Sequence, residues 1–422
     1  MKSQLRFLLL NTFFPPYSFG GDAIYVWRLA NALAGDGHLV DVLHCADSWE
    51  MLARGVSAAP PLSSHPNVTI YPLRSRPRAL ASLATHQTGF PLGRRAQIAA
   101  AIDGKHYDVV HFNNISMFGP GILNVSTSNP PPVKLYTVLE YWLVCARHTL
   151  WKFDRRPCES RQCLQCVIQG GRPPQLWRST DLIARTTGRV DRFLAPSRAV
   201  AILHAEHGFR RPMDVLPLFT EVPTDAPIDA PARPFERPYF LFAGRLEPIK
   251  GAEVLLQAWK RVGDADLVIA GEGSRADRLR SASAGDRRIH FVGQVSQPDL
   301  GAYYRHAIAT VVPSLFEEPF GLTAIESMAH RTPIIAHRVG GLREIVEESC
   351  GGIMYTGTDQ LADAMRKLRD DSNLRRAMGE RGYQACLANW SRPAHLRRYY
   401  DIIEEVAAAR RAGSNREHGF AG

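Results

Sequence analysis

Residues 309–336 have the sequence ATVVPSLFEEPFGLTAIESMAHRTPIIA. Residues 309–312 have the length and apolar character of a buried strand, and a second such run covers 333–336. Between the two runs lie a polar loop and a stretch whose apolar residues recur at helical spacing. A strand, a loop, a helix and another strand in succession are typical of a parallel sheet covered by helices.

The same alternation continues outward to both ends of the 422-residue chain. We expect further strands at 239–243, 267–270 and 289–292, and before them at 5–10, 39–44, 68–71, 109–112, 135–139, 193–196 and 214–217. Residues 222–238 interrupt the pattern, because they are rich in proline and lack apolar periodicity. The predicted fold class is therefore α/β, with two doubly wound, Rossmann-like domains joined by a linker and facing across a cleft.

The domain boundaries follow from this pattern. We place an N-terminal domain at 1–221, with a cysteine-containing insertion at about 145–177, a proline-rich linker at 222–238 and a C-terminal domain at 239–390. Residues 391–411 have a helical pattern and are expected to pack back on the N-terminal domain. Residues 412–422 have the small, polar composition of a flexible tail.

The bulk composition narrows the class of protein. With 51 Lys and Arg against 41 Asp and Glu, the net charge of +10 favours anionic partners without choosing among phosphates, nucleic acid and acidic lipids. No apolar run approaches the roughly 20 residues of a membrane span. The first apolar run is followed by Pro15 and Pro16 instead of a small-residue cleavage site, so we interpret it as a buried strand. Seven unevenly spaced cysteines are not a disulfide scaffold and fit a reducing cytoplasm.

Polar loops after the strands are the places to look for a site, since ligands of open parallel sheets bind beyond the carboxyl ends of the strands. Gly20 and Gly21 precede a helix, where backbone N–H groups can approach an anion, although a plain turn explains the pair equally well. Arg245 and Lys250 follow the strand at 239–243 and suit a diphosphate. A solvated basic loop is the alternative.

Two carboxylates flank the helix start in the opening stretch. Glu318 precedes the helix, and Glu326 lies inside it among apolar residues such as Ile325 and Met328. An unpaired carboxylate in such surroundings would be costly, so Glu326 needs a partner, and a bound ligand is one candidate. A surface helix with ordinary acidic residues is the alternative.

Motifs that together resemble a known family run along nearly the whole chain: Gly20-Gly21, 107–111 (YDVVH), 141–145 (YWLVC), Gly244-Arg245 with Lys250-Gly251, Gly271-Glu272-Gly273, Phe291-Val292-Gly293, and Glu318 followed after seven residues by Glu326. In this order they resemble the retaining glycosyltransferases of family 4, also called glycosyl transferases group 1, which have the GT-B fold. The expected enzyme is a hexosyltransferase-type glycosyltransferase (EC 2.4) of glycan biosynthesis.

The resemblance implies a role for each matched residue. Arg245 and Lys250 would neutralise the diphosphate of a UDP, GDP or ADP sugar, and Gly20 and Gly21 would touch it from the other domain. Glu326 would hold the ribose, and Glu318 would contact sugar hydroxyls. The remaining donor-binding residues would be Gly271, Glu272, Gly273, Val292, Val295, Phe320, Gly321, Leu322 and Thr323. The resemblance implies no cofactor for catalysis and a glycan, lipid-linked or small-molecule acceptor.

One position departs from the family pattern. Many relatives have His-Asp before Tyr-Trp, whereas this chain has Leu139-Glu140. Leucine cannot form a hydrogen bond, so we predict that Glu140 supplies the missing polar contact on the sugar or acceptor side. His111 is a second candidate to compensate and is equally well explained as a buried residue at a strand end. Weakened transfer is the third alternative.

The cysteines Cys145, Cys158, Cys163 and Cys166 include one Cys-x-x-Cys pair and supply enough thiolates for structural zinc. Their irregular first spacing leaves free buried thiols as the alternative.

Arginines also gather between leucines in one segment, at Arg74, Arg76, Arg78, Arg94 and Arg95. This segment suits an anionic membrane or a polyanionic acceptor, with a solvated loop as the alternative. A cytoplasmic or membrane-peripheral protein is expected, and nothing besides net charge supports nucleic-acid binding.

Two other functions are compatible with the same shape. A nucleotide-sugar epimerase would change the donor without an acceptor. A donor-binding protein with weakened transfer would follow from the leucine at position 139.

Overall fold

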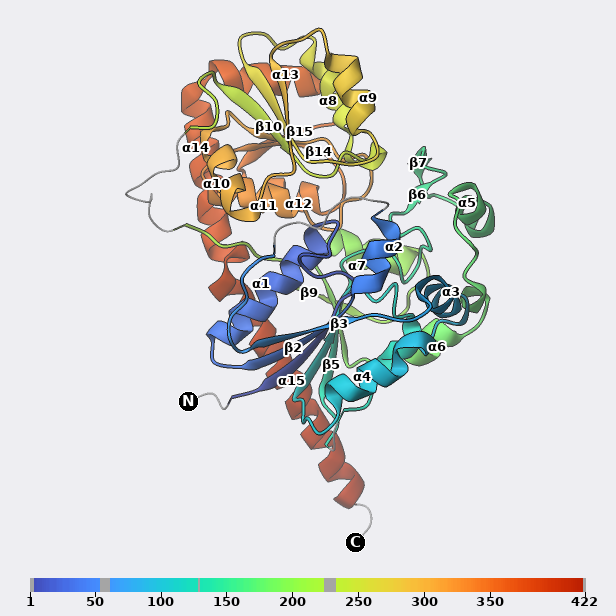
Figure 1. The fold of residues 1–422 in the computed structure, drawn as a ribbon. Helices are drawn as coiled ribbons and strands as arrows, with labels where there is room; N and C mark the ends of the chain where they lie inside the picture. Colours follow the sequence, from blue (N-terminus) through green and yellow to red (C-terminus); the bar gives the residue numbers. More distant parts are fainter. Residues whose placement is uncertain (1–3, 54–60, 128–129, 224–232, 420–422) are drawn as a thin grey trace.

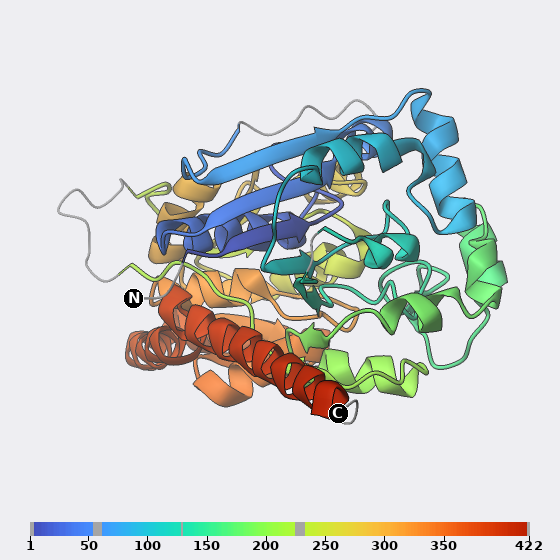
Figure 2. The same ribbon diagram turned by 90° about the horizontal axis from the view of Figure 1, so that it is seen from below.

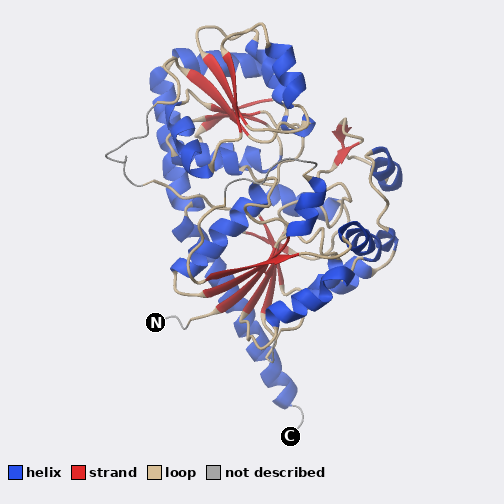
Figure 3. Ribbon diagram, in the orientation of Figure 1, coloured by secondary structure: helices blue, strands red, loops and turns tan. Residues whose placement is uncertain are grey.

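Two parallel sheets, each covered by helices, form two α/β domains (Figures 1 and 3). The computed structural model describes residues 4–53, 61–127, 130–223 and 233–419. The predicted fold class is confirmed, because neighbouring strands in both large sheets pair in parallel. Of the predicted linker, residues 224–232 lie outside the described part of the chain.

The N-terminal sheet has seven strands in the order β3-β2-β1-β4-β5-β8-β9. The strands are β1 (Arg6–Leu10), β2 (Leu39–Cys45), β3 (Val68–Leu73), β4 (Val109–Phe112), β5 (Val133–Thr137), β8 (Arg192–Ala195) and β9 (Met213–Val215). Its helices are α1 (Gly21–Gly35), α2 (Ala46–Leu52), α3 (Arg78–Thr88), α4 (Arg95–Ile102), α6 (Leu182–Thr187) and α7 (Arg198–Glu206), with short 3-10 turns η1 (Leu92–Arg94), η2 (Pro120–Asn124) and η3 (Leu176–Ser179). The residues from Phe7 to Leu10 are fully buried, which explains why β1 is a continuous apolar run.

The cysteine-containing segment follows β5 and extends from the domain. It carries the antiparallel hairpin of β6 (Trp151–Lys152) and β7 (Arg156–Pro157), followed by the short helix α5 (Cys163–Gln169). The hairpin and α5 project from the flank of the N-terminal domain (Figure 1).

The C-terminal sheet has six strands in the order β12-β11-β10-β13-β14-β15. They are β10 (Tyr239–Ala243), β11 (Asp266–Ala270), β12 (Ile289–Gly293), β13 (Thr310–Val312), β14 (Ile334–His337) and β15 (Gly352–Tyr355). The helical elements are η4 (Pro248–Lys250), α8 (Ala252–Trp259), α9 (Ala276–Ser283), α10 (Gln297–His306), α11 (Leu322–Ala329), α12 (Gly340–Ser349), α13 (Thr358–Asp370), α14 (Ser372–Ala385) and η5 (Cys386–Trp390).

The edge strand β15 was not expected from the sequence. Its first residue, Gly352, lies so close to β14 that an added Cβ would meet the Ile334 carbonyl oxygen at 2.4 Å. The close approach requires glycine, and glycine weakens the apolar pattern by which strands are predicted.

The last helix, α15 (Arg392–Gly419), runs from the side of the C-terminal domain along the N-terminal domain (Figures 1 and 2). The Tyr399 ring stacks on His111, and Arg410 forms an ion pair with Asp191 at 2.7 Å. The predicted tail at 412–422 is wrong over residues 412–419, because the helix continues through them. A packed helix propagates readily into a polar segment without proline.

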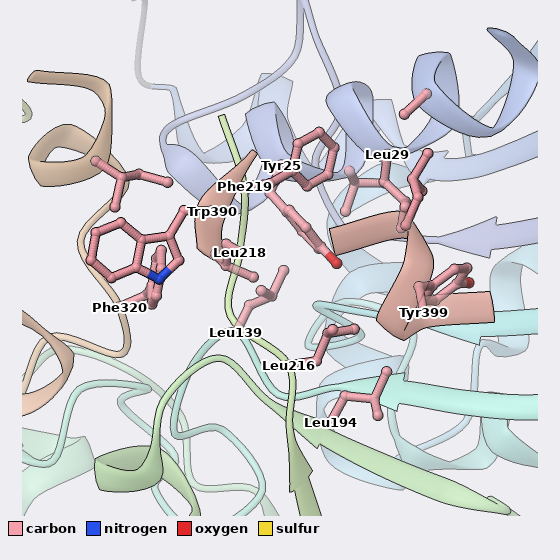
Figure 4. Close-up of a cluster of buried hydrophobic side chains, with 14 of the residues drawn as sticks. Tyr25, Leu29, Leu139, Leu194, Leu216, Leu218, Phe219, Phe320, Trp390 and Tyr399 are labelled. Atoms are coloured by element: carbon pink, nitrogen blue, oxygen red, sulfur yellow. The ribbon is translucent and has the colours of Figure 1, made fainter. Parts of the chain in front are cut away.

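The two chain crossings between the domains lie side by side. Thr220 pairs with Ser391, and the Thr220 N–H donates to the Trp390 carbonyl oxygen at 2.9 Å. Around them one apolar cluster joins both domains, with Leu139, Leu218 and Phe219 on one side and Phe320 on the other (Figure 4). The described residues contain no helix with the length and apolar character needed to cross a membrane.

Candidate functional site

The loop after β1 meets the start of α11 across the space between the domains. A Cβ added to Gly21 would lie 3.0 Å from Leu322 Cδ1, and one added to Gly20 would lie 3.8 Å from Arg245 Nε. The structure therefore brings the predicted glycine pair together with Arg245 and the first turn of α11. Helix α11 begins after Gly321, whose φ of 124° suits glycine.

Two loops of the C-terminal domain are joined so that Lys250 meets Glu318. Gly251 has φ 72°, and an added Cβ would lie 1.9 Å from the Pro313 carbonyl oxygen. The Leu315 N–H donates to the Ile249 carbonyl oxygen at 2.8 Å. The Lys250 Nζ consequently lies 2.8 and 3.0 Å from the two carboxylate oxygens of Glu318. Both side chains keep some exposure, 21% and 14%, so solvent and ligands can reach the pair.

The neighbouring glutamate, Glu317, has a structural role. Its carboxylate accepts the Gly340 N–H at 2.7 Å at the start of α12. A carboxylate at a helix N-terminus satisfies a free backbone donor and complements the helix dipole. This contact separates the two adjacent glutamates and leaves Glu318 as the one that faces Lys250.

Glu326 is buried, with 7% of its surface exposed, and has two protein partners. Its Oε1 accepts from Arg28 Nη2 at 2.6 Å, and its Oε2 accepts from the Tyr304 hydroxyl at 2.9 Å. The sequence indicated that Glu326 needs a partner but did not indicate Arg28 or Tyr304. Arg28 lies on α1 and Tyr304 on α10, so only the fold brings the three together.

The glycine loop after β11 packs on the Arg245 loop. Cβ atoms added to Gly271 and Gly273 would lie 1.9 Å from the Gly244 and 2.6 Å from the Leu246 carbonyl oxygens. The Leu246 N–H donates to the Glu272 carbonyl oxygen at 2.9 Å. The loop therefore borders the site through its backbone.

The side chains of the other predicted donor-binding residues lie in varied surroundings. The Glu272 carboxylate pairs with Arg280 at 2.5 Å, and Thr323 Oγ1 donates to the Ala243 carbonyl oxygen at 3.4 Å. Phe320 is buried in the apolar cluster that joins the domains (Figure 4). Val292 and Val295 pack at the edge of a small cluster around Tyr239 and Leu300.

On the N-terminal side, Glu140 is paired with His148. The Glu140 Oε2 lies 2.5 Å from His148 Nδ1, and the side chains are 20% and 23% exposed. His148 has φ 71°, in the left-handed region that few non-glycine residues adopt. The sequence placed Glu140 here but missed His148, eight residues later in an irregular segment.

Asp22 is a further carboxylate that the sequence analysis missed. Its Oδ2 accepts from Asn114 Nδ2 at 3.1 Å. Burial and then the charge of Glu140 raise the pKa of Asp22, while Asn114 and, more weakly, Arg245 lower it. Charged groups of both domains therefore act on Asp22, Glu140 from the N-terminal domain and Arg245 from the C-terminal domain.

Leu139 and His111 do not supply a polar contact in the cleft. Leu139 is 9% exposed and packs in the apolar cluster between the domains (Figure 4). The ring nitrogens of His111 contact Thr137 Oγ1 at 2.7 Å and the Tyr399 hydroxyl at 2.9 Å. Burial, helped by His395, lowers the pKa of His111 to about 3. Both nitrogens are engaged, so the structure supports the buried strand-end alternative for His111.

The four clustered cysteines border one small cavity of about 20 Å³. All four are free thiols. Burial raises the pKa of Cys158, and the neighbouring cysteines raise it further. Over the described ranges, no group of three or more His, Cys, Asp or Glu side chains is arranged to hold a metal ion. The arrangement gives structural zinc no support, and zinc binding stays a prediction.

The arginine segment is less exposed than its sequence indicates. Arg94 is fully buried and pairs with Asp47 at 2.8 Å, so it is a core residue and not part of a basic surface. Arg74 and Arg78 both pair with Glu50. Exposed leucines remain beside them, with Leu80 at 65% and Leu83 at 45%.

Comparison with known proteins gives two family matches that together span most of the chain. The model described as Glycosyltransferase Family 4 matches residues 19–222, and that described as Glycosyl transferases group 1 matches residues 226–385. A D-inositol 3-phosphate glycosyltransferase from Arthrobacter sp. (strain FB24) is 27% identical over 93% of this chain and 92% of its own length. The protein of the same name from Pseudarthrobacter chlorophenolicus is 29% identical over 89% of both chains.

Solved structures share the fold. Sucrose-phosphate synthase from Thermosynechococcus elongatus superposes with a TM-score of 0.71 at 21% identity. The superposition covers 96% of this chain and 100% of the synthase chain. Anabaena Alr3699/HepE in complex with UDP-glucose superposes with a TM-score of 0.66 at 15% identity, covering 97% and 100% of the two chains.

Proposed function

The chain belongs to glycosyltransferase family 4, within the glycosyl transferases group 1, and from this premise we propose that it transfers a sugar, with retention of anomeric configuration, from a nucleotide-diphosphate sugar to an acceptor held by the N-terminal domain. Membership makes the chain a glycosyltransferase of hexosyltransferase type with the GT-B fold.

The Lys250–Glu318 pair carries the proposal. Lys250 belongs to the segment after β10 that also contains Arg245, and Gly20 lies against Arg245. The pair joins a cation and a carboxylate at 2.8 Å in a partly exposed position. A diphosphate entering this space would attract Lys250 and Arg245, because charge-assisted hydrogen bonds to phosphate are strong. Glu318 would then be free to accept hydrogen bonds from sugar hydroxyls.

The acceptor side of the proposal rests on Glu140 and His148. Their side chains are 2.5 Å apart and partly exposed, so a hydroxyl could reach the carboxylate. In the proposed reaction the bond from the anomeric carbon to the diphosphate oxygen breaks, and a bond to the acceptor oxygen forms on the same face. The acceptor proton passes to the leaving phosphate oxygen, and Glu140 orients the acceptor by hydrogen bonding.

The donor nucleotide is proposed to be UDP. The HepE structures contain UDP and UDP-glucose, which makes these the first ligands to test. For the acceptor, the curated relatives act on an inositol phosphate by name. Burial lowers the pKa values of Arg172 and Arg178, and the charge of Glu140 is one of the contributions that oppose this lowering. On the strength of the relatives' names, we propose a phosphorylated polyol as the acceptor.

The test begins with binding. Thermal unfolding is measured with UDP, GDP and ADP and with their sugars, and a raised midpoint identifies the nucleotide. Transfer is then measured with the matching sugar and inositol phosphate. Binding of none of the three nucleotides would overturn the proposed function.

Two controls separate the alternatives. Incubation with UDP-glucose alone would yield an isomerised sugar if the protein were an epimerase, an alternative that the matches to transferases do not favour. Donor binding without hydrolysis or transfer to any acceptor would indicate a binding protein.

Contact with an anionic membrane is a separate part of the proposal. Leu80 and Leu83 are exposed on α3 beside Arg78, a combination that suits the surface of a bilayer. Sedimentation with vesicles containing phosphatidylglycerol tests this contact, with neutral vesicles as the control. Equal recovery with both would argue against it.

A further inference from the structure

Arg28 links the two domains through a buried ion pair. Its Nη2 donates to Glu326 Oε1 at 2.6 Å and to Gln297 Oε1 at 3.0 Å. Arg28 lies on α1 of the N-terminal domain. In the C-terminal domain, Gln297 is the first residue of α10, and Glu326 lies inside α11. The paired side chains are only 8% and 9% exposed.

The Glu326 carboxylate is held at both oxygens. The Tyr304 hydroxyl donates to Oε2 at 2.9 Å, so Arg28 and Tyr304 fix the plane of the carboxylate between them. Each carboxylate oxygen can accept a second hydrogen bond, because an ionised carboxylate has about four acceptor positions. Glu326 is therefore oriented without being saturated.

The guanidinium of Arg28 is not saturated either. Its Nη1 is buried and has no hydrogen-bond partner among the residues that the structure describes. A buried charged donor without a partner is costly, and such groups in native proteins are normally satisfied by protein, water or ligand. The unsatisfied Nη1 therefore indicates a ligand atom that accepts a hydrogen bond beside Glu326.

We infer that Arg28 is a positioning residue for the donor: it fixes the Glu326 carboxylate from the opposite domain and offers Nη1 to the ribose diol that Glu326 receives. This inference rests on the proposed function. A vicinal diol matches the pair chemically, since one hydroxyl can donate to the carboxylate while the oxygen of the other accepts from the guanidinium. Arg28 thus completes a ribose site that neither domain has alone.

Arg28 also affects how the two domains close on each other. The Arg28–Glu326 contact exists only when α1 and α11 are close, so it stabilises the arrangement in which the two domains are in contact. A nucleotide that binds both residues is stabilised by closure and stabilises closure in return, because coupling between two equilibria is reciprocal. Loss of Arg28 should therefore weaken both nucleotide binding and domain closure.

The experiment measures UDP affinity by calorimetry for the wild type, Arg28→Leu and Arg28→Lys. Arg28→Leu should weaken UDP binding by about tenfold, within the usual range of a coupling between sites. Arg28→Lys should be intermediate, because an ammonium can pair with Glu326 but lacks the second amino group of the planar fork. The matched control is Arg198→Leu, which removes another ion pair between the domains, at 2.6 Å to Glu348. It should leave UDP affinity unchanged.

A second ligand separates positioning from a general structural role. The wild type should bind 2′,3′-dideoxy-UDP much more weakly than UDP, whereas Arg28→Leu should distinguish the two poorly. Thermal unfolding without ligand shows whether each variant is folded, and Arg28→Lys replaces Arg28→Leu in this comparison if the latter is not. Two outcomes would overturn the role of Arg28 while leaving the proposed function standing. One is a folded variant that binds UDP as tightly as the wild type does, and the other is a folded variant that discriminates between the two nucleotides as well as the wild type does. A wild type that binds none of UDP, GDP and ADP would overturn the proposed function and this inference with it.

Discussion

The Lys250 ammonium is held by both carboxylate oxygens of Glu318, a residue 68 positions later in the chain. The pair exists because Gly251 lets its loop approach Pro313 and because Leu315 donates to Ile249. Each partner is thereby held in place without being deeply buried. A ligand that carries both a diphosphate and hydroxyls would replace this contact with stronger ones.

Lys250→Ala should abolish turnover while leaving the fold intact. Removing a cation aimed at developing phosphate charge typically lowers kcat about 100- to 1,000-fold. The partner that remains, Glu318, is 14% exposed and can be solvated. Steady-state transfer from the donor sugar measures the loss, with Lys260→Ala, at an exposed position directly after α8, as the control. Normal turnover in Lys250→Ala would refute the donor-site assignment.

Glu326→Ala should also abolish turnover, but it should cost stability as well. The structure shows that it would leave Arg28 buried and unpaired, which costs about 3–5 kcal/mol in comparable buried pairs. Urea unfolding measures the change in the free energy of unfolding. Glu326→Ala as stable as the wild type would show that the Arg28 contact is weak in solution.

Glu140→Gln should lower kcat by about 100-fold, the loss that a misoriented reacting group can cause, with UDP affinity unchanged. His148→Gln should have a smaller effect, because the carboxylate that contacts the acceptor remains. Calorimetry with UDP and initial rates of transfer separate binding from turnover. Weakened UDP binding in Glu140→Gln would move Glu140 from the acceptor side to the donor side.

The sequence predicted the fold well and the site only in part, for a physical reason. Strands such as 239–243 are local apolar runs, and their order along the chain predicts a parallel sheet. The Arg28–Glu326 contact joins residues 298 apart, and no local pattern carries such a pairing. The two adjacent glutamates, Glu317 and Glu318, likewise differ only through their tertiary partners.

Burial explains the remaining differences between sequence and structure. Arg94 belongs to a basic, leucine-containing segment in the sequence, yet Asp47 pairs with it in the interior. His111 is the last residue of the family motif at 107–111, and α15 covers it through Tyr399. Which of several similar side chains turns inward depends on partners that are distant in sequence.

Stability should fall on acidification because four histidines are buried in neutral form. Burial lowers the pKa values of His44, His204 and His395 to about 4 and that of His111 to about 3. Unfolding restores the ordinary value of about 6.5, so the unfolded chain binds more protons below that pH. The contribution is fully present above pH 6.5 and is lost as the pH falls toward the folded pKa values.

In that window each of these histidines should lower the free energy of unfolding by about 1.4 kcal/mol for each pH unit of acidification. Urea unfolding at several pH values between 7.5 and 5 measures the slope. His111→Asn should reduce the slope by one histidine's share. A pH-independent free energy of unfolding would contradict the buried, neutral state.

Leu139→His, which restores the residue that many relatives have, should not increase turnover in this chain. Leu139 packs with Phe320 and Leu218 in the apolar cluster between the domains, where an imidazole would have no polar partner (Figure 4). Burying such a group should cost about 1–3 kcal/mol. It would also disturb the contact through which the domains meet, so transfer should fall together with stability. Thermal unfolding and initial rates of transfer measure both. A rise in turnover without loss of stability would mean that position 139 faces the reacting sugar, and that Glu140 does not replace the missing histidine.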